Sequence, residues 1–209
     1  EVLTQTQTAL AGWWKVLEVL DKEVEVKEPD QGMTLPDSPL DIKVEGVDFS
    51  YRTGGVVLDN VDIYIPAGIS VAVVGETGSG KTTFAKLLTR LADPTSGRIL
   101  INGEDLRKID SNHRHKGIRM VPQDGFLFDT SVVENVRFGR NDAKRSEAEE
   151  AIDDLGLWSW VDQLPEGLET RVGERGEALS VGERQLVALA RAQVADPGLL
   201  ILDEATSAI

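Results

Sequence analysis

The chain has 209 residues, of which 41% are hydrophobic and 28% charged, and these proportions are ordinary for a globular protein that buries a core. Its formal net charge of −14 and its pI near 4.6 argue against nucleic acid and against anionic lipid as partners, because both demand basic patches. The absence of cysteine excludes disulfide frameworks and thiolate metal sites.

The first half of the chain predicts a helix, a linker and then strands. Residues 1–22 carry Leu10, Trp13 and Leu20 at helical spacing, and residues 23–40 are acidic and rich in proline. No apolar run reaches the roughly 18 residues that cross a bilayer, and no signal peptide is visible. From Asp41 the pattern becomes one of short alternating strands. We expect strands at 42–47, 61–65 and 99–101, the last ending in an Asn102-Gly103 turn.

The second half predicts buried strands that alternate with helices. The expected strands are 69–74, 118–121 and 199–202, and the expected helices are 82–91 and 186–195. Residues 131–178 are predicted to be mostly helical, with loops at 139–142 and 165–167. Buried strands separated by helices favour an α/β fold with a parallel sheet.

A glycine-rich segment that begins at Gly75 matches the pattern G-x-x-x-x-G-K-[ST] of a phosphate-binding loop. Glycines let successive backbone amides turn toward phosphate oxygens, and the following helix N-terminus adds partial positive charge. We expect Lys81 to reach the β- and γ-phosphates and the Thr82 hydroxyl to bind Mg²⁺. A simple turn at a strand end is disfavoured, because a predicted strand precedes the loop and a helix follows it. The predicted nucleotide-binding residues here are Gly75, Glu76, Thr77, Gly78, Ser79, Gly80, Lys81, Thr82 and Thr83.

Two carboxylates, Asp203 and Glu204, follow the apolar run 199–202. Ligands of open α/β sheets bind beyond the carboxyl ends of the strands, so this pair lies beside the phosphate loop if the two strands are neighbours. Asp203 would then hold Mg²⁺, and Glu204 would orient or deprotonate an attacking water. A solvated Asp-Glu at a strand exit is the alternative, and the phosphate loop upstream makes it the weaker one.

Ser180 and Glu183 form an S-x-x-E capping box ahead of a helix. The same residues allow a second reading, in which Ser180 and Gly182 bind an anion at the helix N-terminus. The two interpretations are compatible, and spacing does not choose between them. His113 and His115 raise the possibility of a metal site, but a solvated polar loop is favoured because no cysteine or third histidine is available.

The run Leu179–Gln185 resembles the signature sequence of the ATP-binding cassette family, with Val181 where glycine is commoner and Glu183 where glutamine is commoner. The resemblance extends from Asp41 to Ile209. It is closest to the exporter type, in which both departures occur.

Several residue roles are implied by this resemblance alone. Tyr51 matches the aromatic residue that stacks on adenine, and Gln123 matches the glutamine that contacts Mg²⁺ and the attacking water. Residues 170–176 resemble the loop that touches the membrane domain in exporters, and Ser207-Ala208 begins a segment that links two nucleotide sites. Without the family, a strand-end aromatic is the favoured explanation of Tyr51, and a solvated loop is the favoured explanation of the Gly-Glu-Arg-Gly run. For Gln123 a turn residue is then as good an explanation as a functional one.

The resemblance implies a P-loop NTPase core with an antiparallel β subdomain and a helical subdomain at about 125–185. Residues 1–40 are expected to be a lead-in helix and linker from an absent transmembrane domain, and 41–209 a nucleotide-binding domain that lacks its C-terminal part. The implied activity is ATP hydrolysis to ADP with Mg²⁺, coupled to export at the cytoplasmic face of the membrane. A second cassette, identical or different, would close over ATP with Ser180 and Gly182. The catalytic residues would be Lys81, Gln123 and Glu204, and the metal ligands Thr82, Gln123 and Asp203.

Family members carry a histidine well downstream of the glutamate, and this chain ends five residues after Glu204. We therefore expect the chain alone to hydrolyse ATP slowly or not at all, although the parent protein should be active. An importer-type or otherwise membrane-free cassette and a non-catalytic regulatory half are the alternatives. A DNA-acting ATPase is disfavoured, because only a short segment separates Gln123 from Leu179 and the chain is acidic.

Overall fold

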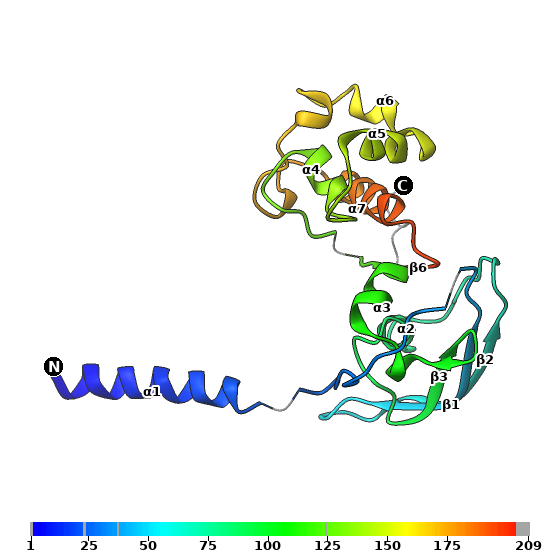
Figure 1. The fold of residues 1–209 in the computed structure, drawn as a ribbon. Coiled ribbons are helices and arrows are strands. Elements are labelled where there is room, and N and C mark those ends of the chain that lie inside the picture. Colours follow the sequence, from blue (N-terminus) through cyan, green and yellow to red (C-terminus); the bar gives the residue numbers. More distant parts are fainter. Residues whose placement is uncertain (1, 23, 37, 124, 204–209) are drawn as a thin grey trace.

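The computed structural model describes residues 2–22, 24–36, 38–123 and 125–203. The predicted N-terminal helix is confirmed as α1 (Val2–Leu20), which projects away from the rest of the chain (Figure 1). Trp13 and Trp14 are 64% and 68% exposed on it. Within the described ranges no helix combines the length and apolarity that a bilayer crossing requires.

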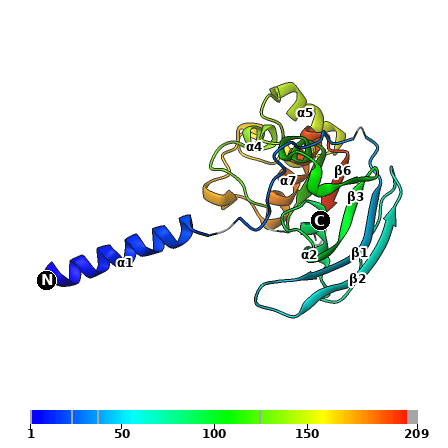
Figure 2. The same ribbon diagram turned by 60° about the horizontal axis from the view of Figure 1, so that its bottom comes forward.

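The first layer is an antiparallel sheet with the strand order β2-β1-β3-β4 (Figure 2). Its strands are β1 (Ile42–Ser50), β2 (Val56–Ile65), β3 (Ser96–Ile101) and β4 (Glu104–Asp105). In the central strand, Val44 pairs with Ile63 on one side and Ile99 on the other, so alternate apolar residues face the core. The predicted turn after β3 is confirmed, with φ of 47° at Asn102 and 82° at Gly103, as a two-residue hairpin requires.

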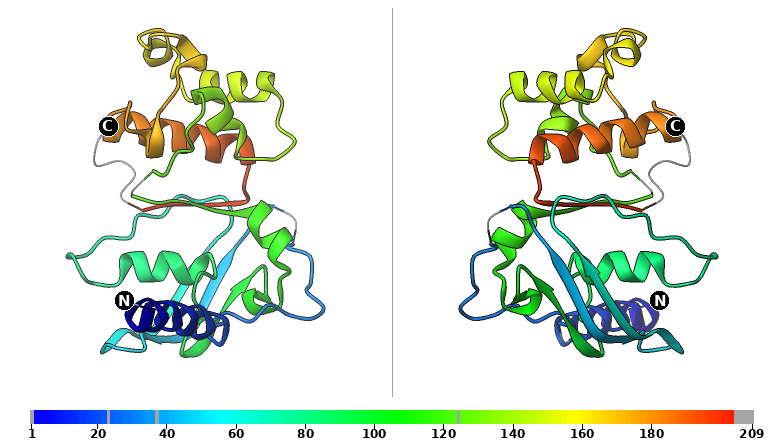
Figure 3. Two further views of the ribbon diagram at one scale, coloured as in Figure 1. Left: turned by 90° about the vertical axis from the view of Figure 1, so that its left-hand side faces the viewer. Right: turned by 90° about the vertical axis from the view of Figure 1, so that its right-hand side faces the viewer.

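A second, parallel pair is formed by β5 (Ile118–Val121) and β6 (Leu199–Leu202), in the positions that the sequence predicts. β5 follows α3 (Ser111–Gly117), which in turn follows a short 3₁₀ helix η1 (Leu106–Lys108). Figure 3 shows this pair between the antiparallel sheet on one side and a group of helices on the other.

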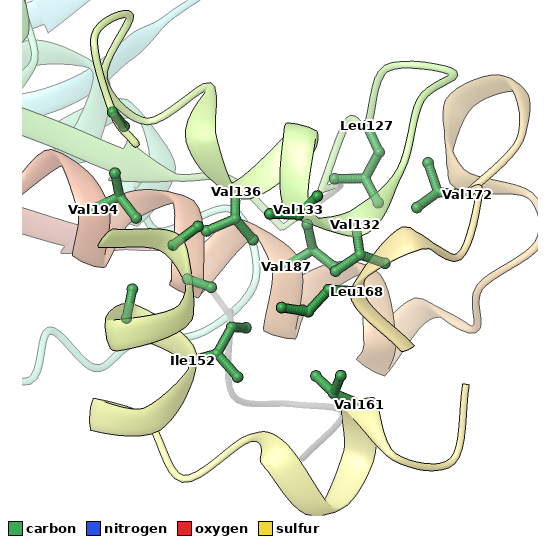
Figure 4. Packing of buried hydrophobic residues seen from close by; sticks show 14 of the residues in the cluster. Leu127, Val132, Val133, Val136, Ile152, Val161, Leu168, Val172, Val187 and Val194 are labelled. Atoms are coloured by element: carbon green, nitrogen blue, oxygen red, sulfur yellow. The ribbon is translucent and has the colours of Figure 1, made fainter. Parts of the chain in front are cut away.

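The helical part contains α4 (Val132–Arg137), α5 (Arg145–Asp154), α6 (Trp158–Val161) and α7 (Val181–Ala195), with 3₁₀ turns η2 (Gly167–Glu169) and η3 (Glu174–Gly176). It has its own core, made mainly of valines and alanines from these helices and from the loops between them (Figure 4). Ile152, Val132 and Val187 are among its fully buried members. Burying such a side chain is worth about 1.5–3 kcal/mol, so this part of the chain has a stable packing of its own.

The sheet packs on α2 (Lys81–Leu88), which buries Phe84, Leu87 and Leu88 against it. This helix was expected at 82–91. It ends earlier because the chain turns at Thr89, and Arg90 adopts a left-handed conformation with φ of 55° that a helix cannot continue.

The predicted buried strand at 69–74 is wrong for the part of the chain that the structure describes. These residues form no strand, and Ile69, Val71 and Val74 are 54%, 51% and 88% exposed. A strand needs a neighbour that completes its backbone hydrogen bonds. Residues 69–73 and β6 both line a groove of about 730 Å³. Among the described residues, this run therefore has no neighbouring strand with which to pair.

The linker is less detached than its composition suggests. The amide of Met33 donates to the carbonyl of Lys108 at 2.8 Å, and the amide of Asp110 donates to the carbonyl of Met33 at 2.8 Å. Leu35 packs against Gly117, where a Cβ atom would collide with it. Residues 24–36 therefore follow the surface of the core rather than hanging free.

Candidate nucleotide-binding site

The phosphate loop reaches α2 through two glycines in left-handed conformations, Gly78 with φ of 84° and Gly80 with φ of 92°. At Gly80 a Cβ atom would lie 3.0 Å from Leu58 Cδ2, so both backbone angle and space call for glycine. The Lys81 ammonium donates to the carbonyl oxygens of Gly75 and Glu76 at 2.8 and 2.9 Å. The lysine is thus held over the loop, where a phosphate chain would lie.

Thr82 and Asp203 meet beside this loop. The Thr82 hydroxyl donates to Asp203 Oδ1 at 3.2 Å, across 121 positions of sequence. Asp203 is fixed there because its amide donates to the carbonyl of Val121 at 3.0 Å, directly after β6. The structure therefore brings together two of the three residues expected to hold a metal ion.

Gln123 comes two residues after β5, at the same edge of the parallel pair. Val121 and Leu202 are register partners, so Gln123 and Asp203 follow the carboxyl ends of neighbouring strands. Gln185 of α7 donates to the backbone carbonyl of Gln123 at 3.4 Å, which connects this turn to the helical part. This is the edge at which open α/β sheets bind ligands.

The oxygen atoms at this edge suit magnesium. A threonine hydroxyl and a carboxylate are hard donors, and Mg²⁺ is ordinarily held by one or two protein groups together with phosphates and water. No cluster of three histidine, cysteine, aspartate or glutamate side chains occurs among the described residues. His113 lies at the start of α3, and its Nδ1 is 3.2 Å from Asp110 Oδ1, the oxygen that caps this helix.

Tyr51 follows β1 and is 44% exposed. Its ring packs edge-on against Phe49 with centroids 4.9 Å apart, and its hydroxyl is 3.1 Å from Thr83 Oγ1. Thr83 is buried next to the phosphate loop, so the tyrosine is tied to the helix that starts there. An accessible, orientated aromatic face beside a phosphate loop suits stacking on a base.

Ser180 caps α7 as the sequence predicts. Its Oγ accepts from the amide of Glu183 at 3.3 Å, and its own amide donates to Glu183 Oε2 at 2.7 Å. Ser180 is exposed and Gly182 half-buried. The pKa of Glu183 lies below its ordinary value because of hydrogen bonds from Ser180 and from the Trp160 indole.

Residues 75–79 of the loop are exposed, whereas Glu204 and Ser207-Ala208 lie outside the described residues. Sequence reasoning passed over Trp160, which reaches Glu183 from another helix. No local pattern could have revealed a contact between positions 23 apart.

A glycine loop ahead of a helix, with an acidic residue beside it at the end of a parallel strand pair, is typical of a P-loop NTPase. A family model described as "ABC transporter" matches residues 58–207. The chain belongs to the ABC transporter family.

Individual relatives agree with this assignment. The chain is 43% identical over 188 residues to the iron-sulfur clusters transporter ATM1, mitochondrial, of Saccharomyces cerevisiae, covering 90% of this chain and 27% of that protein. It is 40% identical to an uncharacterized ABC transporter ATP-binding protein, YfiC, of Bacillus subtilis, covering 97% of this chain and 33% of that protein. It thus spans a quarter to a third of the length of these relatives.

A solved structure of a bacterial Atm1-family ABC exporter with ATP bound superimposes on the chain with a TM-score of 0.89. The two are 35% identical, and the match covers 98% of this chain and 36% of that one. The predicted fold class is thereby confirmed.

Proposed function

We propose that this chain is the ATP-binding and ATP-hydrolysing unit of an ABC exporter. The contact that carries the proposal is the one between Thr82 and Asp203, because it joins a phosphate loop to an acidic strand end with the oxygen donors that Mg²⁺ uses. The resemblance to ATM1 and to an ATP-bound exporter supports the same conclusion.

In this proposal the loop amides and Lys81 bind the phosphates of ATP, and Tyr51 stacks on the adenine. Lys81 would exchange its two carbonyl partners for phosphate oxygens. Phosphate oxygens are stronger hydrogen-bond acceptors than carbonyl oxygens because they are charged. Mg²⁺ would be held by Thr82 and Asp203, with Gln123 beside them, and when bound it neutralises charge on the phosphates. Glu204 would orient the attacking water.

The proposed working unit is a pair of cassettes. Ser180 and Gly182 of one cassette would cover the ATP held by the other, so that ATP joins the two and hydrolysis to ADP releases them. A transmembrane domain in the same polypeptide, connected through α1, would place the chain at the cytoplasmic face of a membrane. We expect the 209-residue chain alone to hydrolyse ATP slowly or not at all.

Titration calorimetry of the chain with ATP tests the binding step. Wild-type chain should bind ATP with magnesium-dependent affinity, and Lys81→Ala should weaken it at least tenfold, as expected for loss of a charge-assisted contact worth about 1.5–3 kcal/mol. Equal binding by both proteins, or none by the wild type, contradicts the proposal.

Hydrolysis is tested separately in the intact transporter. Glu204→Gln should retain ATP binding and lose turnover, because an amide cannot take a proton from water. An unchanged rate would favour a regulatory, non-catalytic role. Turnover of several per second by the 209-residue chain alone would refute the expectation that it is inactive.

A further inference from the structure

The start of α7 carries an interaction beyond its capping box. Glu183 Oε2 accepts from the Ser180 amide, while Glu183 Oε1 accepts from the Trp160 indole Nε1 at 3.0 Å. A capping box needs only the first of these bonds. Both carboxylate oxygens are thus engaged, and the second ties this helix start to α6.

The indole is held in place by the helical core. α6 buries Val161 in that core, and Trp160 is half-buried against the same cluster. The amide of Trp160 donates to the carbonyl of Leu157 at 3.0 Å, which fixes the short helix from which the ring extends. The indole donor therefore reaches Glu183 from a ring that packs against the helical core.

The two hydrogen bonds of Glu183 bear on the backbone amides at the start of α7. The amides of Val181 and Gly182, the first two helical residues, have no intrahelical acceptor at their positions. A Glu183 carboxylate that swung outward would compete with an incoming anion for these amides and repel it. With Trp160 and Ser180 bonded to its two oxygens, the carboxylate is held by these partners and is not free to turn toward those amides.

We propose that Trp160 is a positioning residue for the anion-binding end of α7, acting through Glu183 to keep Ser180 and Gly182 open to the phosphate of a facing ATP. This inference rests on the proposed function above. Trp160 itself touches no nucleotide in it.

The hydrogen bond is tested first by NMR of the ¹⁵N-labelled 209-residue chain. The Trp160 indole N–H should exchange with solvent more slowly than that of Trp158, its neighbour in α6. Glu183→Gln should move the Trp160 resonance and leave the Trp158 resonance in place. Equal exchange of the two indoles, together with no shift in Glu183→Gln, overturns the inference.

The functional role is tested in the intact transporter with Trp160→Phe, which keeps a ring but loses the donor, and with Trp158→Phe as the matched control. Trp160→Phe should raise the half-saturating ATP concentration for hydrolysis several-fold, with kcat changed less than twofold, while Trp158→Phe changes neither. In a Glu183→Gln background, Trp160→Phe should have no added effect.

The outcomes separate the two proposals. A wild-type protein that binds no ATP would refute the proposed function. Normal ATP binding combined with an unchanged half-saturating concentration in Trp160→Phe would refute this inference alone. A fall in melting temperature without that change in ATP dependence would assign Trp160 a purely structural role and also overturn it.

Discussion

Glu28 and Arg114 lie 86 positions apart in the sequence, yet Glu28 Oε1 accepts a hydrogen bond from Arg114 Nη2 at 2.6 Å. Glu28 Oε2 is also 3.5 Å from Arg90 Nη1, and Arg90 donates to the carbonyl of Lys27 at 2.7 Å. Both arginine side chains are only 3% exposed. One linker carboxylate therefore serves two buried guanidinium groups, one just after α2 and one in α3.

Glu28→Gln should lower the free energy of unfolding by about 1–3 kcal/mol, because removing one partner leaves buried charges less well compensated. The half-exposed position of Glu28 keeps the effect below that of a fully buried pair. Urea unfolding followed by circular dichroism measures it. Glu25→Gln is the control, since Glu25 meets the 75% exposed Arg52 at 3.5 Å, and it should change stability by less than about 0.5 kcal/mol. Equal effects of the two substitutions would contradict this account.

The Glu28 contribution should depend on pH in a defined direction. The hydrogen bond from Arg114 and the charges of Arg114 and Arg90 hold the pKa of Glu28 below its ordinary value of 4.5. Its stabilisation is therefore complete above pH 4.5 and is lost as the pH falls through the lower folded-state pKa. The stability difference between wild type and Glu28→Gln should be constant from pH 7 to 5 and shrink below 4.5. A difference that grew toward acid pH would have the wrong sign.

Tyr51→Ala should weaken ATP binding by about tenfold, because a base that stacks on an aromatic ring loses roughly 1–3 kcal/mol when the ring is removed. Tyr51→Phe keeps the ring and loses only the hydroxyl contact with Thr83, so its affinity should stay within about twofold of wild type. Calorimetry with Mg-ATP compares the two. If both variants bind as tightly as wild type, the adenine lies elsewhere.

Thr82→Val and Asp203→Asn should each reduce, by about tenfold or more, the gain in ATP affinity that Mg²⁺ provides, since the first removes a hydroxyl ligand and the second removes the negative charge from the proposed metal site. The double variant should lose little more than either single one, because the two groups act on one ion. Binding is measured with excess Mg²⁺ and again with EDTA. Asp196→Asn at the end of α7 is the control, as asparagine tolerates its left-handed conformation with φ of 45°. A loss of Mg²⁺ dependence in this control as well would contradict the assignment of Thr82 and Asp203 as metal ligands.

Local patterns predicted most of the elements because they depend on near neighbours. The capping box at Ser180 and the hairpin turn at Asn102 follow from residues three positions apart or fewer, and the structure contains both. The strand at 69–74 was predicted from its own apolar side chains. A strand also depends on its neighbours, and no sequence window contains that information.

In the candidate site, too, the features set by near neighbours could be predicted, and those that depend on distant segments could not. The loop that contains Lys81 can be read directly from its motif. The approach of Asp203 was inferred from a strand at 69–74 beside 199–202, and the structure brings Asp203 to Thr82 without that strand. The bonds from Trp160 to Glu183 and from Arg114 to Glu28 could not be predicted at all. They join segments far apart in the chain and follow from tertiary packing alone.

The exposed run at 69–74 has a practical consequence for anyone who purifies this chain. It is uncharged, contains no proline and is rich in β-branched side chains, which is the composition of segments that stack between molecules. The adjacent β6 also presents Leu200 and Leu202 at 42% and 45% exposure. Concentrated samples should therefore tend toward intermolecular β-pairing and fibrous deposits, and a lysine at position 73 would act as a gatekeeper against them.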